Sequence, residues 1–108
     1  MVGDGSQGVE SRPYTNLVGL RVVDDEGYGR YRAAMTPILE RFGGRFGYDF
    51  VVSEVLRSEV EAPIDRVFTI VFPDRETCQA FFADPEYQQV RAAYFVPAVS
   101  HTTIIAEY

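Results

Sequence analysis

His101 is the only histidine in this 108-residue chain. Histidine exchanges protons near neutral pH, so a general acid or base step would use this side chain most naturally. The alternative is structural, because a histidine at the start of an edge strand can simply be exposed or hydrogen-bonded. We take His101 as the candidate catalytic residue.

Four tyrosines have the helical spacing of side chains that face a sheet: Tyr28, Tyr31, Tyr87 and Tyr94. A tyrosine hydroxyl in an apolar cavity can orient or protonate an oxygenated ligand. Amphipathic packing, with the hydroxyl reaching water, is the alternative. Tyr31 and Tyr94 are the candidate ligand-binding tyrosines.

Arg45 and Arg66 begin two strands that the predicted topology makes neighbours. A guanidinium there can bind a ligand carboxylate through two hydrogen bonds. It can equally pair with Asp49, Glu54 or Asp65, or mark the rim of a dimer. We take Arg66 as a candidate ligand-binding residue.

Cys78 is the single cysteine, so the chain cannot form an internal disulfide. It lies in the first turn of a predicted helix, where the positive end of the helix dipole favours a reactive thiolate. It also shares a stripe with Phe81 and Phe82, and core packing is the preferred interpretation.

Composition excludes several classes of function. The net charge of -6 disfavours nucleic-acid binding, and the absence of lysine excludes Schiff-base chemistry. The sequence contains no metal-ligand spacing, phosphate-binding loop, catalytic triad or identifiable carboxylate pair, so we predict no metal and no cofactor. It has no secretory signal pattern and no apolar run of about 20 residues, which predicts a cytoplasmic protein without membrane contact.

The elements expected to position these side chains start with a strand over residues 14–23 and a helix that Asp24 or Asp25 caps. Tyr28, Tyr31, Met35, Ile38, Leu39 and Phe42 form the apolar stripe of that helix. Pro37 lies inside it and is expected to kink or loosen it, and glycines 43 and 44 end it.

Residues 45–57 alternate in polarity and predict a half-solvated strand, whereas residues 67–72 predict a central strand buried on both faces. Asp74 is expected to cap one helix, and Asp84 followed by Pro85 a second. Residues 101–108 predict the last strand. The glycine-rich residues 1–13 are interpreted as a flexible leader and residues 14–108 as one domain.

This order of elements predicts an α+β fold of the ferredoxin-like βαββαβ type. It has a four-stranded antiparallel sheet and helices on one face. Such a sheet would leave apolar side chains uncovered on its other face. A second copy of the chain is the simplest cover, so we predict a homodimer built sheet on sheet.

Three segments carry a family resemblance: ILERFGGRF (residues 38–46), RVFTIVFP (residues 66–73) and FFADPEYQQVR (residues 81–91). The last resembles the signature aromatic-x-x-S/D-P-E-Y-Q-x-V/A-R of the bacterial family called domain of unknown function 1330, within the dimeric α+β barrel superfamily. The resemblance covers most of residues 14–108. The glycine-rich leader and the aromatic residues 94 and 95 after the signature depart from the family pattern.

The resemblance implies a pocket between sheet and helices in each subunit, but the family has no established reaction. The superfamily includes cofactor-free monooxygenases, isomerases, haem enzymes and ligand-sensing domains. Haem binding is disfavoured because the only histidine lies at a strand start. The hypothesis is a dimeric pocket protein, acting as a cofactor-independent monooxygenase- or isomerase-like enzyme on a small oxygenated or aromatic metabolite. The alternative is a non-catalytic metabolite-binding or interaction module.

Overall fold

The computed structural model describes residues 12–108, so the predicted leader lies outside the described residues except for its last two positions. The elements are β2 (Tyr14–Val22), α1 (Asp25–Arg41), β3 (Arg45–Val51), β4 (Arg66–Phe72), α2 (Arg75–Ala83), α3 (Pro85–Val90), the π-helical turn η1 (Arg91–Phe95), α4 (Val96–Ala98) and β5 (Val99–Glu107). No helix in the described part is long and apolar enough to cross a membrane.

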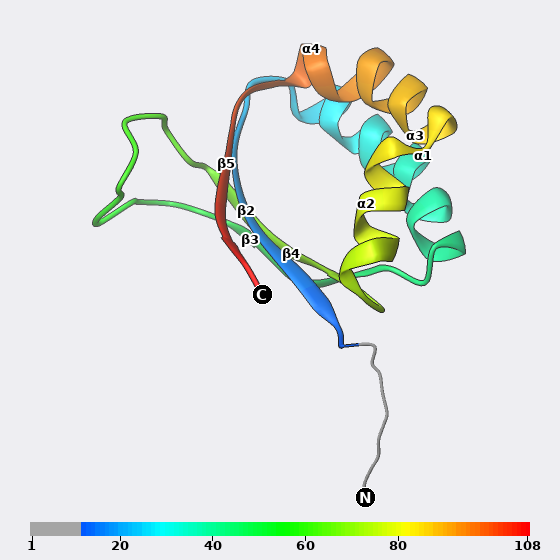
Figure 1. Cartoon of the computed structure of the whole chain (residues 1–108). Helices are drawn as coiled ribbons and strands as arrows, with labels where there is room; N and C mark the ends of the chain where they lie inside the picture. Colours follow the sequence, from blue (N-terminus) through cyan, green and yellow to red (C-terminus); the bar gives the residue numbers. More distant parts are fainter. Residues whose placement is uncertain (1–11) are drawn as a thin grey trace, which may run out of the picture.

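The four strands form one sheet in the order β3-β4-β2-β5, and every neighbouring pair is antiparallel. The helices all lie on one side of this curved sheet (Figure 1). Both features confirm the predicted ferredoxin-like arrangement, with β4 and β2 at the centre of the sheet.

Helix α1 begins at the predicted cap, where the Asp24 carboxylate accepts a hydrogen bond from the Gly27 backbone N–H at 3.1 Å. Its predicted apolar stripe faces the sheet, and every stripe residue except the half-buried Phe42 is buried. The helix continues through Pro37 and ends at Arg41, after which Gly43 adopts a φ of 75°.

Two aspartates cap α2 and α3 as predicted. The Asp74 carboxylate accepts from the Thr77 N–H at 2.7 Å, and the Asp84 carboxylate accepts from the Tyr87 N–H at 2.9 Å. Pro85 is the first residue of α3, where its missing N–H costs no hydrogen bond.

Strand β3 differs from the prediction, because it ends at Val51 and residues 52–65 form a long loop. The register with β4 also shifts between Phe46 and Asp49. The Tyr48 N–H donates to Thr69 Oγ1 at 2.7 Å instead of continuing the ladder. A Cβ at Gly47 would lie 2.5 Å from that oxygen, so this bulge requires the glycine.

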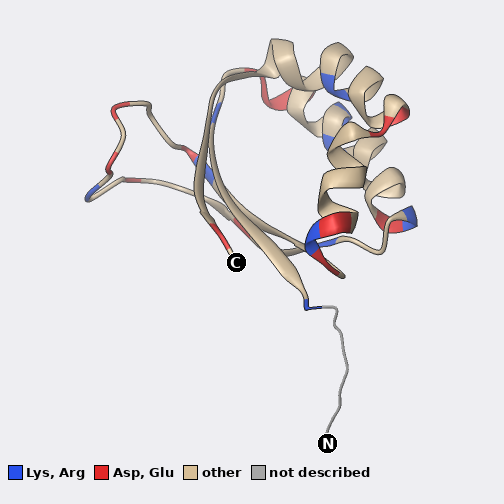
Figure 2. Cartoon of the chain, in the orientation of Figure 1, with Lys and Arg blue, Asp and Glu red and all other residues tan. Residues whose placement is uncertain are grey.

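We call the sheet surface away from the helices the open face. Side chains alternate between the two faces of a strand, and Val18 and Leu20 lie in the core, so Gly19 and Arg21 face the open side. The open face carries Leu17, Tyr48, Phe50, Val67, Val71 and Ile105. Figure 2 shows that the strands are mostly uncharged, whereas charges gather on the helices and the loop of residues 52–65.

Candidate functional site

A cleft of about 570 Å³ opens between α2 and the helix-facing side of the sheet. We call it the α2 cleft, and its wall consists of Asn16, Cys78, Gln79, Phe82, Ala83, Ile104 and Glu107. The volume lies within the range of small-molecule sites. The wall is mostly apolar, and Glu107 is the only charged side chain that residues 12–108 contribute to it.

Local structure explains how these residues meet. Cys78, Gln79, Phe82 and Ala83 follow one side of α2, because residues four apart lie one turn apart on a helix. Asn16 of β2 is the direct cross-strand partner of Glu107 in β5, so their side chains project from the same face of the sheet. The helix and the sheet therefore supply opposite walls.

Asn16 is the most unusual polar group of the cleft. It is only 6% exposed, and its Nδ2 atom makes a long hydrogen bond of 3.7 Å to Cys78 Sγ. Its Oδ1 atom is buried and accepts no hydrogen bond from residues 12–108, the part that the structure describes. A buried acceptor without a partner costs about 1–3 kcal/mol, so a group that donates to Oδ1 would recover that free energy.

The thiol and the carboxylate of the cleft have different properties. Burial raises the pKa of the Cys78 thiol, which keeps it protonated and weakly nucleophilic at neutral pH. The prediction that Cys78 packs in the core is confirmed, since it is 5% exposed. Glu107 lies nearer to solvent and accepts a hydrogen bond from the Tyr14 hydroxyl at 2.7 Å.

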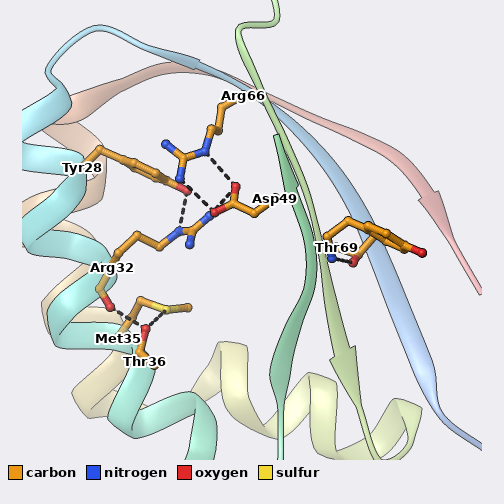
Figure 3. Close-up of polar contacts among 8 residues, drawn as sticks. Tyr28, Arg32, Met35, Thr36, Asp49, Arg66 and Thr69 are labelled. Atoms are coloured by element: carbon orange, nitrogen blue, oxygen red, sulfur yellow. Dashed lines mark hydrogen bonds and ion pairs between the residues drawn. The ribbon is translucent and has the colours of Figure 1, made fainter. Parts of the chain in front are cut away.

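A second polar group, which we call the arginine cluster, joins α1 to the sheet and consists of Tyr28, Arg32, Asp49 and Arg66 (Figure 3). Arg66 donates two hydrogen bonds to the Asp49 carboxylate, at 2.8 and 2.9 Å. Arg32 reaches the same carboxylate at 3.1 Å and donates from Nε to the Tyr28 hydroxyl at 2.8 Å. Two guanidinium groups thus share one carboxylate.

The electrostatics of the arginine cluster follow from this geometry. The hydrogen bonds from Arg66 hold the pKa of Asp49 below its ordinary value, and burial raises the pKa of Tyr28. The Arg32 guanidinium also lies 3.9 Å from the centre of the Phe46 ring, which is a cation–π contact. These contacts tie three elements together and use the hydrogen-bonding capacity of Asp49.

The predicted site residues lie in different surroundings. Tyr31 is buried, and its hydroxyl is hydrogen-bonded to that of Tyr87 at 2.8 Å, while burial raises the pKa of Tyr31. Arg66 forms an ion pair with Asp49. Pairing with Asp49 was one of the alternatives to ligand binding that the sequence left open. Tyr94 is 37% exposed, whereas its neighbour Phe95 is buried against Tyr31 with ring centres 4.9 Å apart.

His101 lies on the other side of the sheet from Tyr31 and Arg66. It is the cross-strand partner of Arg21, so it belongs to the open face. It is exposed, with Nδ1 at 2.9 Å from the Ser100 hydroxyl oxygen. Arg21 itself pairs at 3.7 Å with Asp65. The sheet therefore separates the predicted catalytic histidine from the predicted ligand-binding residues.

The sequence interpretation missed both Asn16 and Arg32. Asn16 had a usable signal, because an asparagine inside the β-prone run YTNLVGLRV at a core-facing position needs a buried partner. Arg32 had none, since its partner Asp49 reaches the helix side only through the bulge at residues 46–49.

Fold and cleft together define a ferredoxin-like α+β protein with a ligand-sized cleft between its sheet and its helices. Residues 16–108 match the family described as Domain of unknown function (DUF1330), and the chain belongs to that family. No protein of curated function matches the chain.

Several solved structures share the fold. A protein of unknown function from Rhodopseudomonas palustris has 20% identity and a TM-score of 0.77, with 92% of this chain and 82% of that chain covered. A dabb family protein with a ferredoxin-like fold from Mesorhizobium loti has 15% identity and a TM-score of 0.62, with coverage of 89% and 94%. SnoaB, a cofactor-independent oxygenase from Streptomyces nogalater, has 13% identity and a TM-score of 0.54, with coverage of 89% and 88%.

Proposed function

We propose that this protein is a homodimer in which each chain binds a small, largely apolar molecule in the α2 cleft. The observation that carries the proposal is the cleft of about 570 Å³, whose wall includes Asn16, a residue with a buried Oδ1 atom that has no partner among the described residues. An apolar wall supplies binding energy, and a few fixed polar groups supply orientation. Both are present in the α2 cleft.

The open face supports the dimer. Tyr48 is 66% exposed and Phe50 is 54% exposed, and their rings stack on each other with centres 5.8 Å apart. A groove of about 790 Å³ continues this surface, and its wall includes Val55, Leu56, Val60, Ile64 and Ile105. A second copy would cover these apolar side chains and leave the α2 cleft, on the other side of the sheet, accessible.

The reaction class we propose is cofactor-independent chemistry on an oxygenated or aromatic metabolite, of the monooxygenase or isomerase type. The structural likeness to SnoaB, a cofactor-independent oxygenase, supports this class. Asn16 and Glu107 are the polar groups that would orient a ligand, and the protonated thiol of Cys78 would contribute packing. The roles predicted for His101, Tyr31, Arg66 and Tyr94 stay predictions.

Binding without turnover is the second candidate, and one observation favours it. Among the described residues, the cleft wall contains neither histidine nor tyrosine, and burial keeps its cysteine protonated, so the Glu107 carboxylate is the one group left for proton transfer. Both candidates require the same ligand in the same cleft. Turnover of the bound molecule separates them.

Ligand binding is tested by NMR, following the backbone amides of α2 while 4-ethylphenol is added. Binding in the cleft should shift the amides of Cys78, Gln79 and Phe82 in the wild-type protein. Ala83→Phe places a ring in the cleft wall and should abolish these shifts. Ala80→Phe is the matched control, because Ala80 is exposed on the same helix outside the cleft wall. Equal shifts in both variants would contradict the proposed site.

A further inference from the structure

We infer that the α2 cleft selects ligands that donate a hydrogen bond, such as a neutral phenol or alcohol, over ligands that only accept one. The inference rests on the proposed function, since it concerns the ligand class of the same cleft. It follows from the inventory of hydrogen-bonding groups that the chain has left unused in the cleft wall.

The first step concerns Asn16. Its amide donor group already points to Cys78 Sγ, at 3.7 Å, while Oδ1 is buried and accepts from no donor in the described part of the chain. The carboxamide therefore has an acceptor to offer and one of its donors engaged. Oδ1 itself is covered, so a ligand can reach it only if the Asn16 amide turns about its last side-chain bond and gives up the long contact with Cys78 Sγ. This torsion is soft in asparagine.

The second step concerns charge. Glu107 offers carboxylate acceptors and is the only charged side chain among the described wall residues, which include no arginine or histidine. An anionic ligand would meet this carboxylate without a cation from the wall, and a ligand carbonyl would find amide donors only, those of the exposed Gln79 and the second N–H of Asn16. Phe82, Ala83 and Ile104 supply apolar contact for the body of the ligand.

The third step joins these two observations. Asn16 and Glu107 are cross-strand partners, so their acceptor groups lie on the same face of neighbouring strands. A hydroxyl group entering between sheet and helix meets acceptors from the sheet and apolar surface from α2. A donor that satisfies Oδ1 removes the penalty of a buried, unpaired acceptor, which an acceptor-only ligand cannot do.

The experiment compares 4-ethylphenol with 4-ethylanisole, in which a methyl group replaces the donated proton. Dissociation constants are measured by NMR titration in the wild-type protein and in Asn16→Leu. The ratio of the two constants within each protein is compared, so that differences in ligand hydrophobicity cancel. We expect the preference for the phenol to fall by about tenfold in Asn16→Leu, the worth of one buried hydrogen bond.

Two further probes apply to the wild-type protein alone and keep the inference testable if Asn16→Leu fails to fold. 4-Ethylacetophenone only accepts hydrogen bonds, and 4-ethylbenzoate is an anion; both should bind more weakly than 4-ethylphenol. Tighter binding of either, or an unchanged ratio in Asn16→Leu, would overturn the inference while leaving a binding cleft. Failure of every probe to shift the α2 amides would instead overturn the proposed function, and the inference with it.

Discussion

Asp49→Asn should destabilise the protein by about 2 kcal/mol, because this isosteric change removes the only carboxylate of the arginine cluster. Asp49 accepts two hydrogen bonds from Arg66 and lies 3.1 Å from Arg32. The side chains of Arg32, Arg66 and Asp49 are 18%, 25% and 32% exposed. Exposed ion pairs contribute about 0–1 kcal/mol to stability, and breaking a buried ion pair costs about 3–5 kcal/mol. The ion pairs of Asp49 are partly buried, so their contribution should lie between those limits.

The assay is urea unfolding followed by circular dichroism, at a fixed protein concentration, since the proposed dimer would make stability depend on concentration. Glu86→Gln is the matched control. It makes the same carboxylate-to-amide change in the pair of Arg41 and Glu86, which is also short, at 2.7 Å, but 56% and 59% exposed. We expect this control to change the free energy of unfolding by less than about 0.5 kcal/mol.

The effect of Asp49→Asn should also depend on pH. The pKa of Asp49 is lowered in the folded protein, so its stabilising contribution is complete above the ordinary pKa of about 4 and is lost as pH falls through the lower folded value. The difference between wild type and Asp49→Asn should therefore be constant from pH 5 to pH 7 and shrink towards pH 3. Equal effects of the two variants at pH 7 would refute the structural role of the cluster.

Two other predictions concern the cleft and the open face. Cys78 should react with iodoacetamide more slowly than free cysteine at pH 7, because burial raises the pKa of its thiol. The rate of this reaction should rise with pH. Addition of 4-ethylphenol should slow the reaction further, because the ligand would cover the thiol in the cleft. Rapid labelling at pH 7, measured by mass spectrometry, would contradict the burial of the thiol. His101→Ala should leave the affinity for 4-ethylphenol unchanged within about twofold, because His101 lies across the sheet from the cleft. A larger loss in NMR titration would show that His101 reaches the ligand, as a general acid–base role requires.

Local signals predicted most of the fold. The caps at Asp24, Asp74 and Asp84 act within one helical turn of their own sequence, so the sequence itself determines where these helices begin. The stripe of α1 follows from helical periodicity in the same way. The βαββαβ order then allows few sheet topologies, and the observed one is among the commonest.

The remaining features depend on contacts that local patterns do not encode. The bulge in β3 needs the hydroxyl of Thr69, which lies more than 20 residues away in the sequence. It places Asp49 on the helix side, where strict alternation from Phe46 predicts the opposite face. The π-helical turn η1 shifts the helical spacing by one residue, so that Phe95 instead of Tyr94 packs against Tyr31.

The candidate site was the least predictable part for the same reason. Its walls come from both ends of the domain, since Asn16 and Glu107 meet only because β2 pairs with β5. An asparagine in an apolar strand can be recognised as unusual from sequence. Its unpartnered oxygen is recognisable only once the surrounding side chains are in place.

Sedimentation equilibrium at about 10 μM tests the central claim most directly, namely that two copies cover each other's open faces and leave the clefts free. Wild-type protein should have twice the 12.2-kDa mass of one chain, and Phe50→Arg should reduce the mass to that of one chain. Val96→Arg, at an equally exposed position in the helical layer, should leave the dimer intact. A monomeric wild-type protein, or a dimer that tolerates Phe50→Arg, would contradict the account.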